Sequence, residues 1–349
     1  MVKGMEILPF LGKAETLPIV DVRTPAEYAR GHIPGAVNIP LFSDEERKKV
    51  GIAYTKSGRG DAIVMGLEFA GPKMKEMALQ AQRIAVENKV LLHCWRGGMR
   101  SASMAWLFQT AGLETGILEG GYKSFRRHVL VFLDDDVPFM VVGGLTGSGK
   151  TDVLRALEDQ GEQVLDLEKL AHHKGSAFGG LGETAQSTNE QFENEIFWKL
   201  KGMSPGGMVW TEDESRTIGR NTLPAGIYKS IRSSPLICLE VSLKSRVERL
   251  VRDYAKFPPE ELAGSVEKIR SRLGDQVTRL ALEGIGEGNF RKTVQLVLGY
   301  YDKTYRYGLG KRDPDRIFSF PVEKGAGISE TAGKILDFAK RIRSGGQFS

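Results

Sequence analysis

Short apolar runs alternate along the chain with segments of helical character. Two of these runs, Pro18–Val22 and Lys89–His93, are bounded by turn or charged residues, as is typical of buried parallel strands. A helix should start at Thr24–Glu27, where an N-cap threonine, a proline at the first helical position and a capping-box glutamate occur together. A second helix is predicted at Ser101–Thr110 and a further strand at Thr115–Leu118. This order predicts an open parallel sheet with helices on its faces.

The alternation starts again after Pro138. A strand at Phe139–Val142 leads into the loop Gly143–Lys150 and a helix that starts at Thr151. From Ser242 onward the pattern is mainly helical, and the strands before it are predicted at Gln163–Asp166, Met208–Trp210 and Leu236–Val241. We therefore expect two α/β domains, at residues 1–130 and 138–349, with a linker at 123–138 that is first basic and then acidic.

Composition narrows the class of protein. The 349 residues are 41% hydrophobic and 27% charged, which is ordinary for globular domains. No apolar run reaches the roughly 18 residues of a membrane span, and Met1–Phe10 lacks the apolar stretch of a signal peptide, so we expect no membrane association and a cytoplasmic location. Two cysteines exclude a disulfide framework. The net charge of +5 is compatible with an RNA partner but does not require one.

The segment His93–Ser101 lies between a strand end and a helix start. Backbone N–H groups of such a glycine-containing loop can converge on an anion, and the helix adds its positive end. A thiol placed there has a pKa of roughly 3.5–7.5 instead of about 8.5, so Cys94 is predicted to be a nucleophile. Cys238, inside an apolar strand, is interpreted as structural. The anion pocket around the thiolate is predicted to consist of Arg96, Gly97, Gly98 and Arg100. The two arginines could instead only brace the fold.

The segment Gly144–Thr151 fits the G-x4-G-K-[ST] pattern of a phosphate-binding loop, with a strand before it and a helix after it. The residues predicted to bind a diphosphate or triphosphate are Gly144, Gly147, Ser148, Gly149, Lys150 and Thr151. Glu212 and Asp213 follow an apolar strand, so they could hold Mg²⁺, act as acid or base, or form a solvated acidic turn. We expect no tightly bound cofactor. The requirement for a metal is left open.

Three arginines, Arg246, Arg249 and Arg252, are spaced three apart on a predicted helix and should share roughly one face. They are weak candidates for contacts with nucleic-acid phosphates, and a solvated helix face is the alternative. The adjacent His172 and His173 do not have the spacing of a zinc site. A hydrogen-bonding role beside a phosphate or a base suits them better.

The first half of the chain resembles the rhodanese family, whose cysteine carries sulfur or selenium as a persulfide or perselenide. The blocks that carry the resemblance are Asp21–Arg23, Glu27–Tyr28, Gly31–Ala36, the cysteine loop and Leu118–Tyr122. Five residues separate Cys94 from Arg100, one more than in ordinary sulfurtransferase loops of this family and as many as in cysteine-dependent phosphatases. The longer loop should accept a tetrahedral phosphorus centre, either a phosphate ester or selenophosphate.

A rhodanese-like domain followed by a P-loop domain resembles the bacterial tRNA 2-selenouridine synthase family. Further similar blocks are Asp166–Glu168, Ala171–Gly179, Gln191–Asn194, Glu212–Gly219 and Tyr300–Asp302. The resemblance implies a transferase that replaces the sulfur of wobble 2-thiouridine in tRNA by selenium from selenophosphate, through an S-geranylated intermediate made from geranyl diphosphate. The P-loop would hold the diphosphate of the prenyl donor, and Cys94 would take selenium from selenophosphate and deliver it to the base. The implied partners are the tRNA and the enzyme that supplies selenophosphate.

Two other functions fit the same residues. One is a cysteine-dependent phosphatase or sulfurtransferase coupled to a nucleotide-binding domain. The other is an RNA-binding nucleotide switch in which Cys94 is a redox sensor. The sequence leaves open the oligomeric state, the residues that contact tRNA, how two sites share one uridine, and whether the P-loop ever binds a nucleotide.

Overall fold

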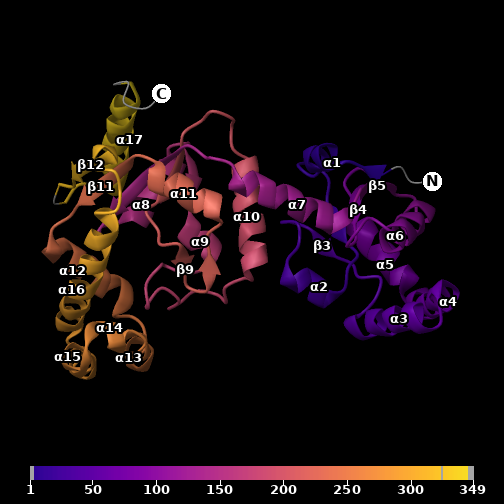
Figure 1. Ribbon diagram of the computed structural model, residues 1–349, viewed down its shortest axis with the longest axis horizontal. Helices are drawn as coiled ribbons and strands as arrows, with labels where there is room; N and C mark the ends of the chain where they lie inside the picture. Colours follow the sequence, from indigo (N-terminus) through magenta and orange to yellow (C-terminus); the bar gives the residue numbers. More distant parts are fainter. Residues whose placement is uncertain (1–3, 324, 345–349) are drawn as a thin grey trace. The chain divides into compact units, whose positions relative to one another are not determined.

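The computed structural model describes residues 4–323 and 325–344, which form two compact units (Figure 1). The first unit comprises Met1–Phe132 together with Glu193–Trp198, and the second comprises Leu133–Phe192 and Lys199–Ser349. The first three residues of the expected domain 1–130, and residue 324 and the last five residues of the expected domain 138–349, lie outside the described part of the chain.

The first unit contains a parallel five-stranded sheet in the order β1-β5-β4-β2-β3. Its strands are β1 (Gly4–Met5), β2 (Ile19–Asp21), β3 (Val37–Asn38), β4 (Lys89–His93) and β5 (Glu114–Leu118). Its helices are α1 (Ile7–Lys13), α2 (Pro25–Arg30), α3 (Asp44–Lys56), α4 (Arg59–Ala70), α5 (Met74–Ile84), α6 (Met99–Thr110) and α7 (Gly121–Asp134), with the 3-10 turn η1 (Gly71–Lys73) before α5. Four successive residues of β4 are buried, because helices cover both faces of the sheet. The predicted open parallel sheet is confirmed.

The predicted start of α2 is also confirmed. The Glu27 N–H donates to Thr24 Oγ1 at 3.3 Å, and the Thr24 N–H donates to Glu27 Oε2 at 3.0 Å, which completes the capping box. These two bonds fix the Glu27 carboxylate at the start of α2, where Arg100 also donates to it.

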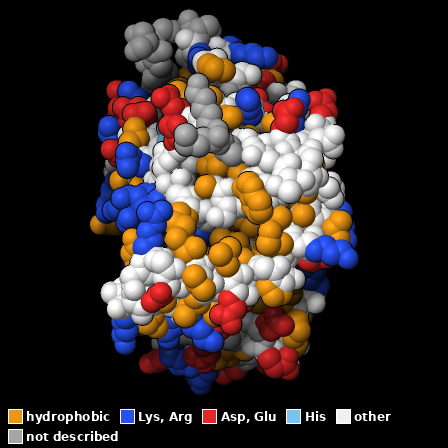
Figure 2. All heavy atoms as spheres, turned by 90° about the vertical axis from the view of Figure 1, so that its right-hand side faces the viewer, with side chains coloured by type: hydrophobic (Ala, Val, Ile, Leu, Met, Phe, Trp, Pro, Cys, Tyr) orange, Lys and Arg blue, Asp and Glu red, His pale blue; other side chains and the backbone are white. Residues whose placement is uncertain are grey.

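Several large hydrophobic side chains of the first unit stay in contact with solvent. Figure 2, which faces the side of this unit that carries α3, α4 and α6, shows hydrophobic side chains gathered on that surface. The exposed large hydrophobic side chains on these three helices are Ile52, Tyr54, Ile63, Val64, Leu67, Met99 and Trp106. These residues do not belong to the core that the sheet builds.

The prediction of a linker at 123–138 is wrong for most of this segment. The structure has the helix α7 (Gly121–Asp134) there. The helix has an apolar stripe at helical spacing, formed by the buried side chains Tyr122, Phe125, Val129 and Leu133. Basic residues lie between the members of this stripe and acidic residues follow it, so the local charge obscured the helical period. The chain therefore passes from one unit to the other in a packed helix.

Part of α10 (Asn189–Lys201) belongs to the first unit, which the sequence did not predict. The Phe197 ring is 1% exposed and meets three rings of α7 edge-on, those of Phe125, His128 and Phe132. Arg126 of α7 donates to Asn194 Oδ1 and to Glu193 Oε2, both at 2.5 Å. A segment some 65 residues away in sequence thus completes the core of this unit.

The second unit contains a parallel five-stranded sheet in the order β12-β11-β6-β8-β7. Its strands are β6 (Phe139–Gly144), β7 (Gln163–Leu165), β8 (Val209–Glu212), β11 (Leu236–Glu240) and β12 (Ile317–Pro321), and a separate antiparallel pair joins β9 (Thr217–Ile218) to β10 (Asn221–Thr222). The helices packed near this sheet are α8 (Lys150–Asp159), α9 (Leu167–Ala171), α11 (Ala225–Ser233) and α17 (Ile328–Ser344). Since β8 is the direct neighbour of β6, the acidic residues at its end lie beside the loop that follows β6.

The rest of the second unit is helical, as predicted from Ser242 onward. The helices are α12 (Leu243–Tyr254), α13 (Pro259–Glu267), α14 (Arg270–Leu273), α15 (Asp275–Gly286) and α16 (Phe290–Leu309), and the 3-10 turn η2 (Pro314–Arg316) follows α16. The sequence did not predict β12, a short strand at the edge of the sheet that pairs with β11. No helix among the described residues is both long and apolar enough to cross a membrane.

The α7–α10 contact predicts a specific loss of stability. Phe197→Ala removes a fully buried ring from between three aromatic partners and should lower the free energy of unfolding of the first unit by about 3–5 kcal/mol. Urea denaturation followed by circular dichroism measures this change. Lys199→Ala, on the exposed side of the same helix, is the control and should stay within about 0.5 kcal/mol of the parent protein. Equal effects of the two variants would contradict the packing role of Phe197.

Candidate active sites

Cys94 lies directly after β4, at the carboxyl end of a parallel strand, and is 3% exposed. Its sulfur lies 3.3 Å from the Ser101 hydroxyl and accepts the Gly98 N–H, also at 3.3 Å. Burial raises the pKa of the thiol, but the Ser101 hydroxyl and the N–H groups of Arg96, Ser101 and Gly98 lower it more, so the pKa lies below the ordinary value. The direction of this shift agrees with the prediction made from the loop sequence.

The turn between β5 and α7 holds the cysteine loop in place. Tyr122 N–H donates to the Cys94 carbonyl at 2.8 Å, and Lys123 N–H donates to the Trp95 carbonyl at 3.0 Å. Gly121 has φ +58°, and a Cβ atom there would lie 2.3 Å from the Cys94 oxygen, so no other residue fits without moving the loop. The Leu118–Tyr122 block therefore supports the loop that carries Cys94.

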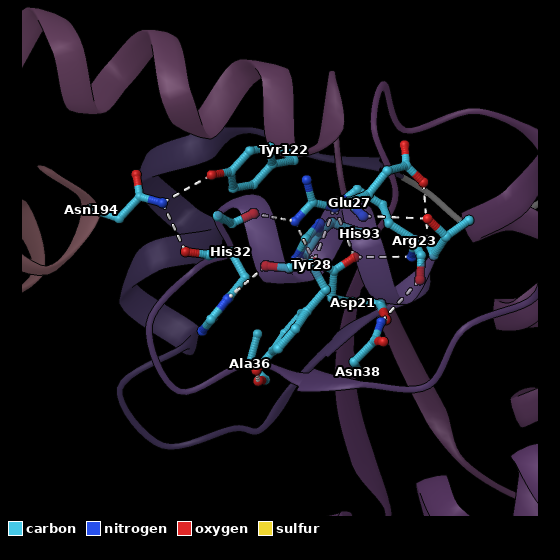
Figure 3. A network of polar contacts seen from close by, with 12 residues as sticks. Asp21, Arg23, Glu27, Tyr28, His32, Ala36, Asn38, His93, Tyr122 and Asn194 are labelled. Atoms are coloured by element: carbon cyan, nitrogen blue, oxygen red, sulfur yellow. Dashed lines mark hydrogen bonds and ion pairs between the residues drawn. The ribbon is translucent and has the colours of Figure 1, made fainter. Parts of the chain in front are cut away.

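A buried ion pair underlies the loop (Figure 3). The Arg23 guanidinium donates to Asp21 at 2.6–3.0 Å and to the Gly31 carbonyl at 2.7 Å, and it lies 3.8 Å from the centre of the Tyr122 ring. Burial raises the pKa of Asp21, but His93 and Arg23 lower it more, so Asp21 is ionised. Since His93 immediately precedes Cys94, the Asp21–Arg23 block anchors the strand that leads to Cys94.

The predicted pocket residues differ in what their side chains do. Arg100 forms a two-point ion pair with Glu27, at 2.6 and 3.2 Å, so the capping box of α2 positions this guanidinium. Arg96 has an exposed side chain. Gly97 has φ +66°, and a Cβ atom there would lie 2.7 Å from the Leu118 oxygen. The structure thus brings the backbone of Gly98 to the sulfur and leaves Arg96 at the surface of the loop.

The second candidate site is the P-loop between β6 and α8. Gly147 and Gly149 have φ +81° and +90°, conformations that other residues rarely adopt. Lys150 Nζ donates to the Gly144 carbonyl at 3.3 Å, and the Thr151 hydroxyl donates to Glu168 Oε2 at 2.9 Å. Ser148 is 4% exposed. The six predicted phosphate-binding residues therefore extend from the end of β6 to the first residues of the ten-residue helix α8, the usual place for an anion.

Helices α12 and α16 hold the P-loop from behind. Arg246 is 3% exposed, forms a two-point ion pair with Asp302 at 2.7 and 2.9 Å, and donates to the Thr146 carbonyl at 3.1 Å. The Gly144 N–H donates to the Tyr305 hydroxyl at 2.8 Å, and that hydroxyl donates to Asp213 at 3.0 Å. The loop conformation is therefore fixed by bonds from a buried guanidinium and a buried phenol.

The three arginines of α12 have different surroundings. Arg246 is buried, Arg249 pairs with Asp152 and lies against Gly149, and Arg252 is 71% exposed beside Asp253. They do not form one exposed surface. Arg249 is instead placed at the phosphate loop, which the helical spacing alone could not indicate.

The two acidic candidates after β8 also differ. Asp213 forms a buried ion pair with Arg312 at 2.5 Å and accepts from Tyr305, so it belongs to the bracing of the P-loop. Glu212 is 2% exposed, and its Oε1 accepts the Glu168 N–H at 2.7 Å. Within residues 4–323 and 325–344, no group of three or more histidine, cysteine, aspartate or glutamate side chains is arranged to hold a metal ion.

A cluster of carboxyl groups lies beside Lys150. Burial, and then the neighbouring acidic charges, raise the pKa of Glu212 well above its ordinary value. Burial and the charge of Glu168 raise the pKa of Glu214 to about 8, and burial also raises the pKa of Glu168. At neutral pH Glu214 therefore largely keeps its proton, so an anion bound at Lys150 meets less repulsion from it. The sequence analysis missed Glu168 and Glu214, whose role depends on burial.

The P-loop lines a cleft of about 1100 Å³ in the second unit. Basic side chains surround it, among them Arg155, Lys169, Lys174, Arg249, Lys256, Arg272 and Lys311. Tyr300, Tyr301 and Tyr305 of α16 line it as well, as does His172, whose Nδ1 contacts the Thr184 hydroxyl. A cleft with this charge and this loop is suited to a diphosphate and to further phosphates nearby.

Family models match both parts of the chain. One described as a rhodanese-like domain matches residues 9–128, and one described as a tRNA 2-selenouridine synthase AAA domain matches residues 137–326. Three curated relatives are named tRNA 2-selenouridine synthase. That of Bordetella bronchiseptica is 41% identical over 85% of this chain and 89% of its own, that of Pseudomonas putida 36% over 84% and 88%, and that of Pseudomonas entomophila 34% over 95% and 94%. A solved structure titled as the N-terminal domain of a putative ATP/GTP binding protein from Clostridium difficile 630 is 38% identical, covers 37% of this chain and 99% of its own, and has a TM-score of 0.34.

The hydrogen bonds to Cys94 predict a change in its reactivity. Ser101→Ala removes the hydroxyl, which is the strongest of the groups that lower the pKa of Cys94, so the pKa should rise and alkylation by iodoacetamide at neutral pH should slow. The rate is measured against pH in a Cys238→Ser background, so that one thiol remains. Ser103→Ala, at an exposed position of the same helix, should leave the profile unchanged. A Ser101→Ala profile that overlays the parent profile would contradict this interaction.

The raised pKa of Glu214 predicts a pH dependence of stability. The folded protein keeps a proton on Glu214 that the unfolded chain releases near 4.5, so the stability contributed by that proton is complete below pH 4.5 and is lost as pH rises through about 8. Glu214→Gln is neutral throughout and should raise the melting temperature above pH 8 by about 2–4 °C, the shift that roughly 1 kcal/mol produces in a domain of this size. Glu183→Gln, in the same cleft, is the control. If the melting temperature of Glu214→Gln falls with pH as steeply as that of the parent protein, the raised pKa does not belong to Glu214.

Proposed function

Because the chain belongs to the tRNA 2-selenouridine synthase family, we propose that it replaces the sulfur of wobble 2-thiouridine in tRNA by selenium, in two steps carried out at two sites. In the first step the sulfur is geranylated with geranyl diphosphate. In the second step selenium from selenophosphate displaces the geranylated sulfur. Such an enzyme is a transferase that acts on tRNA in the cytoplasm and works beside the enzyme that supplies selenophosphate.

The P-loop is the proposed site of the first step. The thiocarbonyl sulfur attacks the first carbon of the geranyl group, the carbon–oxygen bond breaks, and diphosphate leaves. Lys150, the loop N–H groups and Arg249 are placed to neutralise the charge that develops on the leaving diphosphate. No nucleotide need be hydrolysed, since the loop serves to hold a leaving group.

The cysteine loop is the proposed site of the second step. S-geranylation turns the sulfur into a better leaving group. The Cys94 thiolate attacks carbon 2 of the base, the carbon–sulfur bond breaks and geranylthiolate leaves. The selenium of selenophosphate then attacks carbon 2 and displaces Cys94, and water splits the selenium–phosphorus bond so that phosphate leaves. The nucleophile is activated by a lowered pKa, and a covalent route divides one difficult displacement into two easier ones. Arg100 and the N–H groups of the loop would bind the phosphate part of selenophosphate.

The observation that carries this proposal is the presence of both devices in one chain. A thiolate with hydrogen bonds from a loop and a P-loop with the largely protonated Glu214 beside it are two different anion sites, and relatives that match 84% or more of the chain are named for one reaction.

The tRNA substrate requires contacts with several phosphates. The basic side chains around the P-loop cleft and the exposed Arg252 are candidates for these contacts, whereas Arg246 is engaged with Asp302. A contact of this kind weakens binding nearly uniformly across sequences when it is removed.

The test is mass spectrometry of nucleosides from 2-thiouridine tRNA incubated with the protein, geranyl diphosphate and selenophosphate. S-geranyl and seleno nucleosides are the expected products. If the tRNA returns unmodified although both donors are active, turnover of a phosphate ester or of thiosulfate should be measured next. Either activity would favour the cysteine-dependent phosphatase or sulfurtransferase that the five-residue spacing to Arg100 also suits.

Two variants should separate the steps. Cys94→Ser should abolish selenium incorporation, by about a hundredfold or more, and leave geranylation largely intact, because only the second step needs the thiolate. Lys150→Ala should weaken diphosphate binding and slow geranylation about tenfold or more, because it removes a charge from the leaving group. The nucleoside assay with each donor measures both effects, and Cys238→Ser is the control for loss of a thiol. Loss of both products in Cys94→Ser would argue against separate sites.

A further inference from the structure

A second, apolar cavity adjoins the P-loop cleft within the second unit. It measures about 70 Å³ and lies between α12, α13, α15 and α16 and the loop at 176–178. Side chains that line it and not the cleft include Val251, Ala255, Leu262, Ile285, Val294 and Leu298. Since they offer a water molecule no partners, an apolar ligand suits the cavity better than water.

The cavity and the cleft share part of their walls. Five residues line both, namely Thr146, Ser176, Leu250, Tyr254 and Tyr301. Thr146 belongs to the phosphate loop itself, so the apolar space starts at the place where the head of a diphosphate would lie. A ligand that fills both spaces must carry a diphosphate at one end and a hydrocarbon at the other.

The helices that line both spaces change character along their length. The first half of α16 contributes Phe290, Val294 and Val297 to the cavity, and its second half contributes Thr304 and Tyr305 to the cleft. Tyr301 stands at the change, and its hydroxyl accepts the Ala177 N–H at 3.0 Å. The Tyr301 hydroxyl therefore has a hydrogen-bond partner within the protein and needs none from a ligand in the cavity.

The cavity is an unfilled space beside a packed hydrophobic core. Leu262, Ile285 and Val297 belong to a cluster of buried side chains among the same helices, and each is at most 6% exposed. Protein interiors are close-packed, and an apolar space left inside one forfeits contacts on its walls. An occupant that restores those contacts would stabilise the bound state, which is the source of binding energy for a hydrocarbon tail.

We propose that this cavity takes the far end of the hydrocarbon tail of the diphosphate donor whose head lies in the P-loop, and that its walls limit the length of tail accepted. The assignment rests on the proposed function, because that function supplies an isoprenoid diphosphate as substrate. Ala255 and Val294 are half-buried and line the cavity away from the phosphate loop, so larger side chains there shorten the space without touching the diphosphate. They are specificity-determining residues and take no part in the chemistry.

The experiment measures binding to the full chain by isothermal titration calorimetry, with three probes. These are inorganic pyrophosphate, dimethylallyl diphosphate and geranyl diphosphate. In the parent protein the affinity should rise in that order, because each longer tail buries more apolar surface. In Ala255→Phe and Val294→Phe the affinity for geranyl diphosphate should fall about tenfold or more, the equivalent of roughly two buried methylene groups, while that for pyrophosphate stays within about twofold.

Matched variants keep the test decisive. Gln295→Phe adds the same ring on the exposed side of α16 and should bind all three probes as the parent does. Val294→Ala enlarges the space and should improve binding of farnesyl diphosphate relative to geranyl diphosphate, which keeps the inference testable if a phenylalanine variant does not fold. Circular dichroism checks the fold of each variant.

The inference and the proposed function fail in different ways. Equal affinities for pyrophosphate and geranyl diphosphate in the parent protein, or phenylalanine variants that bind geranyl diphosphate as Gln295→Phe does, would overturn the tail site even if geranylated tRNA forms. Tail-dependent binding without any geranylated or selenated nucleoside would retain the tail site and overturn the proposed reaction.

Discussion

Both candidate sites depend on the same constraint. At each, a loop follows a buried parallel strand, and its backbone packs so closely against another segment that a side chain would not fit between them. At the cysteine loop the contact is between Gly121 and the Cys94 carbonyl, where a Cβ atom would lie at 2.3 Å. At the P-loop it is between Gly144 and the Leu239 carbonyl, where a Cβ atom would lie at 2.9 Å. Glycine is needed because any side chain would push the loop away from its support. N–H groups that point at an anion follow from this geometry.

Buried ion pairs then hold these loops in position. Asp21–Arg23 lies beneath the cysteine loop, and Arg246–Asp302 and Arg312–Asp213 lie behind the P-loop. Burying such charges costs desolvation energy, which a pair offsets only when further hydrogen bonds use its remaining donors. Arg23 meets this condition with the Gly31 carbonyl, and Arg246 meets it with the Thr146 carbonyl. We infer that these pairs are placed to hold the loops in position. A contribution to net stability explains their positions less well.

Burial raises the pKa of the acidic groups at both sites, but its balance against the neighbouring groups differs between them. Around Cys94, hydrogen-bond donors outweigh burial, and the pKa of the thiol is lowered. Around Lys150, burial and mutual repulsion outweigh the donors, and the pKa values of Glu168, Glu212 and Glu214 are raised. The first arrangement favours an anion that can act as a nucleophile, and the second lowers the negative charge beside the proposed diphosphate site. A two-step substitution, with one step that needs a thiolate and another that needs a held leaving group, uses both.

The sequence by itself determined the features whose causes are local. The strands around Cys94 and the P-loop, the capping box of α2 and the phosphate-binding pattern all follow from neighbouring residues, and both family resemblances rest on such blocks. Only the tertiary structure decided that 121–134 is a helix, that Glu193–Trp198 packs on it, that Arg246 is buried, and that an apolar cavity adjoins the P-loop. The physical reason is that hydrophobic period and capping act within a few residues, whereas burial, ion pairing and cavity shape depend on which distant segments pack together.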